Sequence, residues 1–293
     1  MWTLTGFLSG VSSGVCTADA GDFRPLALLA IAGTAGWYVL GVIRLRARSA
    51  PSGMVGPARI AGMAAGLSML AVALTSPIDA LAGGMLSAHM LQHLLVMLIA
   101  SPLIVWGLPL PVFRSALPRF TRRTLGSLRM SSCFGSLADL FRRPPTAWLL
   151  FSGSIAFWHL PVLYRWAQSG GGPHALMHLT FLVAGLLFWS VVLEPSGGKR
   201  RLDHGGAMLF VFSTALATGL PGALLSFASK PIYLEPLGSF DPLGLSALQD
   251  QRLAGLIMWI PMDFVLFAVA GALFAACLQE RATRSADCRA AGS

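Results

Sequence analysis

The chain has little charge. Only 11% of its 293 residues are Asp, Glu, Lys or Arg, whereas an ordinary soluble domain carries about 25%. In contrast, 55% of the residues are hydrophobic and the mean hydropathy is +0.69. A chain this apolar has too few polar side chains to cover the surface of a soluble fold. The composition therefore excludes an ordinary soluble protein and indicates one membrane domain.

Cysteine is also scarce. Cys16, Cys133, Cys277 and Cys288 form no CxxC motif and no paired spacing, so neither a disulfide framework nor a thiolate metal site is indicated. The start of the chain lacks the basic region of a cleavable signal peptide, and we expect its first apolar span to persist. The net charge of +9 does not indicate a nucleic-acid partner, because the basic residues lie in gaps between apolar segments rather than on a soluble face.

Seven apolar segments are long enough to cross a bilayer. A hydrocarbon core of about 30 Å requires roughly 20 apolar residues in a helix, since an unpaired backbone group in hydrocarbon costs several kcal/mol. The predicted fold is all-α, a polytopic transmembrane bundle formed by 25–278, with an outer segment 1–24 and a cytoplasmic tail 279–293. The predicted spans are 25–43, 56–74, 84–106, 146–164, 174–193, 205–227 and 252–278.

The lysines and arginines predict the orientation. Seventeen of the 21 lie on one side of the predicted spans, near 44–59, 114–143, 199–201 and 281–289. Short loops rich in these residues stay in the cytoplasm, so we expect the N-terminus outside, the C-terminus inside, and a multi-pass protein of the bacterial inner membrane. The loop 108–143 mixes apolar residues with its arginines, which suits contact with anionic lipid headgroups.

Five of the six histidines fall in three predicted spans, within about 13 Å of the expected outer interface. Two pairs have i, i+4 spacing, which places each pair on one helical face. Ionisable groups are costly in lipid and normally face the bundle interior, where they meet partners. We therefore expect a shared metal site formed by His89, His93, His159, His174 and His178.

Copper is the metal that these residues favour. Met85 and Met97 extend the first histidine pair into a ladder of four residues, and imidazole with thioether is a ligand set suited to copper. The plainer alternatives are histidines with independent hydrogen bonds and methionines that only fill space. Pro161 removes a backbone hydrogen bond and can open the helix near His159.

The spacing of the histidines also has three other interpretations: a zinc protease, a di-iron hydroxylase and a haem protein. His89-Met90-Leu91-Gln92-His93 lacks the glutamate of HExxH, which excludes a zinc protease, and the histidines are too few for a membrane di-iron hydroxylase. We do not expect an enzyme. A bis-histidine haem between His93 and His178 is physically allowed and is the main alternative to copper. Beside copper supply and haem binding, a metal-free assembly scaffold is the third possible function.

Several residues outside the histidines carry weaker signals. Asp263 falls near mid-membrane, where a carboxylate needs a partner, and we expect a hydrogen bond from a neighbouring helix. Asp250 and Gln251 either support the histidines or mark a helix start. His204 is expected in a solvated loop. Small residues should let helices approach closely: Gly62, Ala65, Gly66, Gly185 and Gly219.

Several spaced motifs occur in order between about 85 and 278: Ala88 to His93, Ser101-Pro102, Trp158-His159-Leu160-Pro161, His174 to His178 followed by Phe188-Trp189, and Asp250-Gln251 followed by Met258 to Pro261. Together they resemble one family, the CtaG-type cytochrome c oxidase assembly factors first named from Bacillus-like bacteria. The resemblance implies an integral membrane protein needed to produce active haem-copper oxidase, with copper supply as its task. The implied partners are oxidase subunits and periplasmic copper chaperones.

Overall fold

The computed structural model describes residues 23–47, 55–107, 109–130, 136, 139–141, 143–193, 202–233 and 243–291. All regular secondary structure in these ranges is helical. The predicted outer segment 1–24 therefore lies almost wholly outside the described residues, as do Cys16, Cys133 and the basic residues 199–201. Of the cysteines whose side chains are described, Cys277 is a free thiol.

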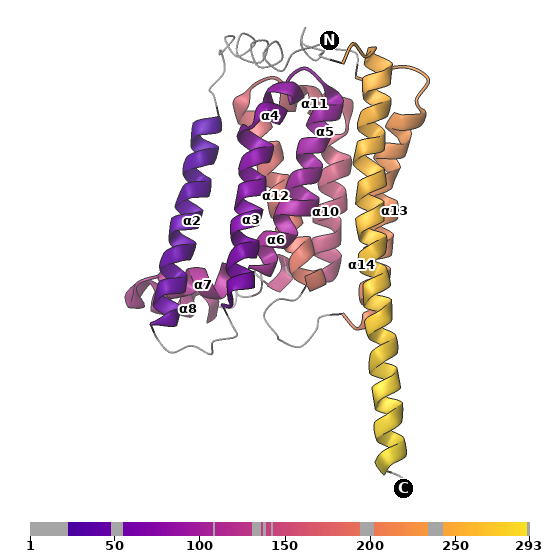
Figure 1. Cartoon of the computed structure of the whole chain (residues 1–293). Helices are drawn as coiled ribbons and strands as arrows, with labels where there is room; N and C mark the ends of the chain where they lie inside the picture. Colours follow the sequence, from indigo (N-terminus) through magenta and orange to yellow (C-terminus); the bar gives the residue numbers. More distant parts are fainter. Residues whose placement is uncertain are drawn as a thin grey trace, which may run out of the picture.

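Six helices in the described ranges are long and apolar enough to cross a membrane. They run side by side as a bundle (Figure 1), and each overlaps a predicted span, which confirms the all-α polytopic fold. Helix α14 continues beyond the predicted span into the expected tail. The helices are α2 (Arg24–Arg46), α3 (Pro57–Thr75), the continuous unit α5 (Leu86–Leu94), η1 (Leu95–Ala100) and α6 (Ser101–Trp106), α12 (Gly171–Leu193), α13 (His204–Phe227) and α14 (Ala247–Ala291).

The predicted span 146–164 is not one helix. Its residues form α10 (Pro144–Trp158) and α11 (Pro161–Gln168), which are bent by 79° relative to each other. Leu160 has extended backbone angles, and Pro161 begins α11. Proline has no N–H to continue α10, yet it fits the first turn of a new helix. The bundle has seven crossings if this bent pair counts as one.

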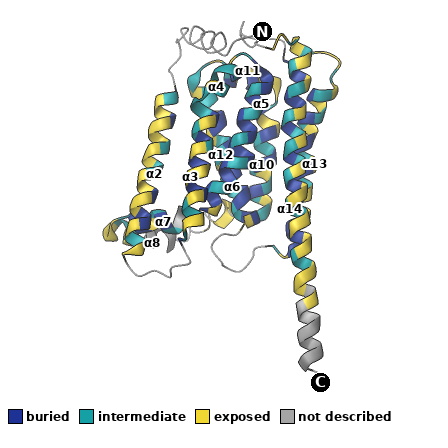
Figure 2. Ribbon diagram, in the orientation of Figure 1, coloured by how far each residue is buried: buried dark blue, intermediate teal, exposed yellow. Residues whose placement is uncertain are grey.

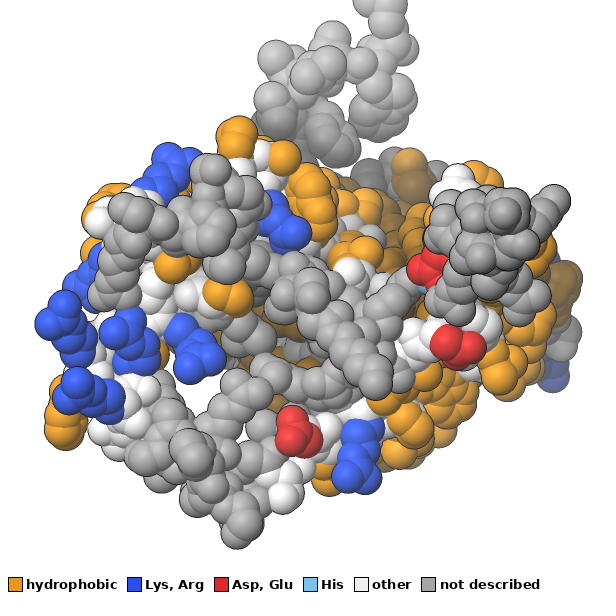
Figure 3. Space-filling model, turned by 90° about the horizontal axis from the view of Figure 1, so that it is seen from below, with side chains coloured by type: hydrophobic (Ala, Val, Ile, Leu, Met, Phe, Trp, Pro, Cys, Tyr) orange, Lys and Arg blue, Asp and Glu red, His pale blue; other side chains and the backbone are white. Residues whose placement is uncertain are grey.

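Three short helices occupy the ends of the bundle. Helix α4 (Pro77–Ala82) connects α3 to α5, while α7 (Pro109–Ala116) and α8 (Arg119–Met130) lie across the opposite end (Figure 1). Ser115 Oγ of α7 donates a hydrogen bond to the Gly41 carbonyl of α2 at 2.7 Å. Basic side chains gather on the face seen from this end (Figure 3), as the sequence predicts for a cytoplasmic side.

Buried residues are most frequent on the central span Leu86–Trp106 and on α12, whereas α2 is largely exposed (Figure 2). In a membrane protein the exposed apolar side chains face lipid. The predicted close approaches occur at four of the five small residues, and Ala65 is instead exposed. The partners across these contacts are Trp106 for Gly62, Ile104 for Gly66, Ser101 for Gly185 and Asp263 for Gly219.

Candidate metal-binding site

A π-helical turn shapes the central span. Pro102 has no N–H for the carbonyl four residues earlier, so the regular hydrogen-bond ladder fails at this point. Ser101 Oγ donates to the Val96 carbonyl at 2.8 Å, and Trp189 Nε1 of α12 donates to the Met97 carbonyl at 2.8 Å. The Ser-Pro and Phe-Trp motifs of the sequence therefore act together. They stabilise a turn of the kind that often lies beside functional sites.

Four histidines form an imidazole cluster, His89, His93, His174 and His178. On α5, the Nε2 atoms of His89 and His93 are 2.8 Å apart. On α12, the Nε2 atoms of His174 and His178 are 3.1 Å apart. The two pairs also meet each other, because the His93 and His178 rings lie 5.0 Å apart and the His89 and His174 rings stack at 5.4 Å. The two i, i+4 pairs, one on α5 and one on α12, therefore face each other.

The cluster contains buried polar atoms without partners. Nδ1 of His89, His93 and His178 has no hydrogen-bond partner among the described residues. In a neutral pair joined through Nε2, one ring donates and the other ring keeps its proton on Nδ1. In the pair on α5, one buried N–H group is therefore unsatisfied, at a cost of roughly 1–3 kcal/mol. A ligand that uses the ring nitrogens would relieve this cost.

The chemistry of the cluster suits a cation, although the rings are not set at coordination distances. Two imidazole nitrogens on one tetrahedral ion lie roughly 3.3 Å apart, given metal–nitrogen lengths of about 2.0–2.1 Å. The distances of 2.8 and 3.1 Å within the pairs are shorter. Within the described part of the chain, no group of three or more His, Cys, Asp or Glu side chains is placed to hold a metal ion. Coordination therefore requires these rings to rotate apart.

His159 lies beside the imidazole cluster rather than within it. Its Nδ1 donates to the Ile155 carbonyl at 2.7 Å, and its Nε2 lies 3.3 Å from Met90 Sδ. Its own carbonyl accepts a hydrogen bond from the Tyr233 hydroxyl at 2.9 Å. His159 is the C-cap residue of α10, just before the break at Leu160, and its ring lies beside the Met90 sulfur. Of the five predicted ligands, four therefore form the imidazole cluster, and His159 lies beside it.

A small cavity connects His159 to the cluster. Its volume is about 20 Å³, which is enough for about one water molecule or ion. The sequence indicated Met97 but missed the other three methionines, although Met258 and Met262 have the same i, i+4 spacing as the histidine pairs. The lining residues are Met90, His93, Leu94, Met97, Ile155, His159, Phe181, Met258 and Met262.

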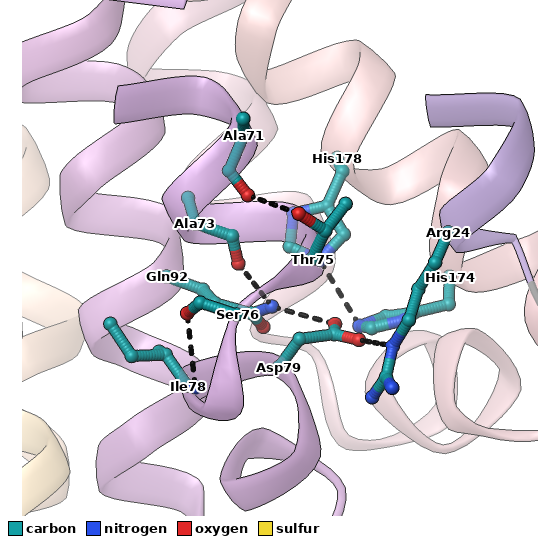
Figure 4. A network of polar contacts seen from close by, with 10 residues as sticks. All are labelled: Arg24, Ala71, Ala73, Thr75, Ser76, Ile78, Asp79, Gln92, His174 and His178. Atoms are coloured by element: carbon teal, nitrogen blue, oxygen red, sulfur yellow. Dashed lines mark hydrogen bonds and ion pairs between the residues drawn. The ribbon is translucent and has the colours of Figure 1, made fainter. Parts of the chain in front are cut away.

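A polar network lies beside the partly exposed edge of the cluster. Asp79 of α4 accepts hydrogen bonds from Arg24 Nε at 2.7 Å and Gln92 Nε2 at 2.8 Å. Gln92 Nε2 also donates to the Ala73 carbonyl. His174 lies next to Asp79 in this network (Figure 4). Sequence reasoning missed Asp79, whose signal is a carboxylate in a short loop just before a histidine-bearing span.

Asp250 is a helix-start carboxylate, but it serves a different helix. Its side chain accepts hydrogen bonds from the backbone N–H groups of Leu86 and Ser87, at 2.6 and 3.1 Å, at the first turn of α5. The adjacent Gln251 is buried and accepts a hydrogen bond from the Ile232 N–H at 2.6 Å. These two residues join α14 to the helix that carries His89 and to the loop after α13.

Two remaining expectations differ from the structure. Asp263 Oδ1 has no hydrogen-bond partner among the described residues; the carboxylate lies against Gly219 of α13 instead, where an added Cβ would be 3.0 Å from Oδ2. His204 is buried, not solvated, and its Nδ1 lies 3.3 Å from a carboxylate oxygen of Glu280. Both residues therefore contribute to the packing of α13 against α14.

Comparison with known proteins identifies related sequences. The model of a family described as cytochrome c oxidase caa3 assembly factor (Caa3_CtaG) matches residues 36–280. The chain is 27% identical over 254 residues to the uncharacterized proteins Mb0105 of Mycobacterium bovis and MT0111 of Mycobacterium tuberculosis, covering 83% of this chain. It is 25% identical over 246 residues to the uncharacterized protein ML1998 of Mycobacterium leprae, covering 81% of this chain. The chain spans only 36–37% of the length of these relatives. No solved structure matches it.

Proposed function

The chain belongs to the cytochrome c oxidase caa3 assembly factor family, and from this premise we propose that it binds copper at the imidazole cluster and supplies it to the oxidase. The observation that carries the proposal is the meeting of two i, i+4 histidine pairs from α5 and α12, in which three buried ring nitrogens have no partner within the described ranges. Copper is the cargo in this function. No catalytic turnover is involved.

The physical setting supports binding of a cation. Imidazole accepts copper in either oxidation state, and a cation in a membrane domain needs several close ligands to offset its desolvation. Asp79 lies beside His174 at the partly exposed edge, where its carboxylate pairs with Arg24. We place this end of the bundle outside, facing periplasmic copper chaperones, and the basic end in the cytoplasm of a bacterial inner membrane. An alkaline phosphatase fused to the C-terminus should then be inactive.

Two other functions make different demands on the same residues. A haem would need a site far larger than the cavity of about 20 Å³, since cofactor pockets hold roughly 300–1,000 Å³. The His93 and His178 rings are also only 5.0 Å apart, less than the roughly 6 Å of two rings that ligate one iron from opposite sides at metal–nitrogen lengths of about 2.0 Å. A metal-free scaffold would need neither ring.

The test combines the purified protein with oxidase formation in the cell. The test variant carries His89→Ala and His178→Ala together. The matched control is His204→Ala, because His204 is also buried but is the first residue of α13 and lies outside the imidazole cluster. Elemental analysis gives copper per chain, and the visible spectrum detects haem. Cellular oxidase activity is then measured with each variant as the only copy.

The proposal expects copper in the wild-type protein and in the control. It expects little copper and little oxidase activity in the double variant. A Soret band without copper would identify a haem protein instead. Normal oxidase activity in the double variant would identify a scaffold and refute the copper function.

A further inference from the structure

The cavity beside the imidazole cluster is lined largely by sulfur and hydrocarbon. Four of the 12 methionines of the chain contribute to its wall, together with two histidines and three apolar side chains. These methionines come from two spans that are far apart in the sequence: Met90 and Met97 from the continuous unit of α5 and η1, and Met258 and Met262 from α14. The helices that surround the imidazole cluster therefore also bring together a set of soft ligands.

The contact between His159 and Met90 is the clearest feature of this cavity. The Ile155 carbonyl can only accept, so His159 Nδ1 must carry a proton at this 2.7 Å hydrogen bond. In the neutral ring, Nε2 then holds a lone pair. It faces the lone pairs of Met90 Sδ at 3.3 Å. Nitrogen and sulfur ligands of one tetrahedral ion lie roughly 3.5 Å apart, from metal–ligand lengths of about 2.0 and 2.3 Å.

The other sulfur atoms belong to residues of packed helices. Met97 lies in the π-helical turn, where its carbonyl accepts a hydrogen bond from Trp189 Nε1. Met258 and Met262 are i, i+4 neighbours, so they lie on one face of α14. Both are buried, with exposed fractions of 8% and 4%. The cavity is thus built from several packed helices and not from a mobile loop.

We propose that the cavity between Met90, Met97, Met258, Met262 and His159 binds a monovalent soft cation, Cu(I), as a second metal site distinct from the imidazole cluster. Thioether sulfur favours Cu(I) over harder divalent ions. The ligands are all neutral and the wall is largely apolar, and an ion's desolvation cost grows with the square of its charge. A monovalent ion therefore costs about a quarter as much to bury as a divalent ion of the same size.

His93 connects the two sites. It belongs to the imidazole cluster through its 2.8 Å contact with His89, and it also lines the cavity with an Nδ1 that has no partner among the described residues. An ion can therefore pass from imidazole to thioether ligands without leaving protein contacts. The choice of copper rests on the proposed function, whereas the binding of a soft monovalent ion can be tested without oxidase assembly.

The experiment uses silver(I), a soft monovalent probe that needs no reductant, with the full chain purified in detergent. Met90→Leu with Met262→Leu removes two sulfur ligands with little change in volume, and such swaps usually cost less than about 1.5 kcal/mol. Met63→Leu with Met177→Leu is the matched control, because these methionines are similarly buried, each with an exposed fraction of 1%, and lie outside the cavity lining. Silver per chain is measured after desalting, and Ni(II) binding is measured in parallel as a report on the imidazoles.

The expected result is a loss of roughly one silver ion per chain in the Met90 and Met262 variant. The control should keep its silver, and both variants should keep Ni(II) binding. Equal silver in wild type and both variants, no silver in the wild type, or an equal loss in both variants would each overturn the thioether site. None of these results affects the oxidase test of the imidazole cluster, so the two proposals fail separately.

Discussion

Replacing Asp250 should weaken the start of the helix that carries half of the imidazole cluster. The carboxylate accepts hydrogen bonds from the N–H groups of Leu86 and Ser87 and from the hydroxyl of Ser87. These donors belong to the first turn of α5, which leads directly into His89. Asp250→Ala leaves the two backbone donors without their acceptor, whereas Asp250→Asn keeps one oxygen but loses the charge.

The size of the effect follows from these contacts. Loss of an N-cap costs about 0.5–2 kcal/mol, and hydrogen bonds to a charged group contribute roughly 1.5–3 kcal/mol. Because the carboxylate is only partly buried, we expect Asp250→Ala to lower the free energy of unfolding by about 2–3 kcal/mol. Asp250→Asn should cost about 1 kcal/mol. Copper bound per chain should fall in the same order as stability.

Asp203 provides the matched control. It caps α13 through one exposed hydrogen bond from the Gly206 N–H at 2.9 Å, so Asp203→Ala should cost about 1 kcal/mol and leave copper binding unchanged. The assay is unfolding in mixed detergent and SDS, followed by tryptophan fluorescence, with elemental analysis of the same samples. The assignment of Asp250 as the anchor of α5 is wrong if the free energy of unfolding of Asp250→Ala is within about 0.5 kcal/mol of wild type. It is also wrong if Asp203→Ala lowers that free energy more than Asp250→Ala does.

Three further predictions concern packing and hydrogen bonding. Gly185→Ala places a Cβ 2.5 Å from a serine hydroxyl of α6 and should lower stability by about 1–3 kcal/mol, whereas Gly33→Ala, with open space around it, should not; equal thermal midpoints would contradict this. Trp189→Phe leaves the buried carbonyl of the π-turn unpaired and should cost roughly 1–3 kcal/mol by the same unfolding assay. Burial raises the pKa of Tyr233, so its hydrogen bond to the His159 carbonyl should stabilise the fold fully below pH 10 and be lost as pH rises through the raised pKa. The tyrosinate absorbance that Tyr233→Phe removes should therefore appear only above pH 10. Ionisation of Tyr233 near pH 10 would refute the burial effect.

Periodicity was enough to predict the bundle and the two histidine pairs. Lengths of about 20 apolar residues predict spans because hydrocarbon cannot satisfy backbone groups. Spacing of four residues places His89 beside His93, and His174 beside His178, because a helix turns once every 3.6 residues. Both properties are local, so the sequence alone determines them. The spaced motifs likewise indicated the family that the comparison confirms.

The distribution of the histidines among sites was decided by tertiary structure. Pro161 indicates that the helix opens near His159, but the 79° angle between α10 and α11 and the contact between the His159 ring and Met90 depend on how the helices pack. Likewise, Met258 and Met262 are some 165 residues from His93 along the chain, and only the packing of α14 against α5 puts them on one cavity. Asp250 reaches α5 for the same reason. Contacts between distant segments depend on helix crossing and side-chain volume, which have no local period that a sequence pattern can reveal.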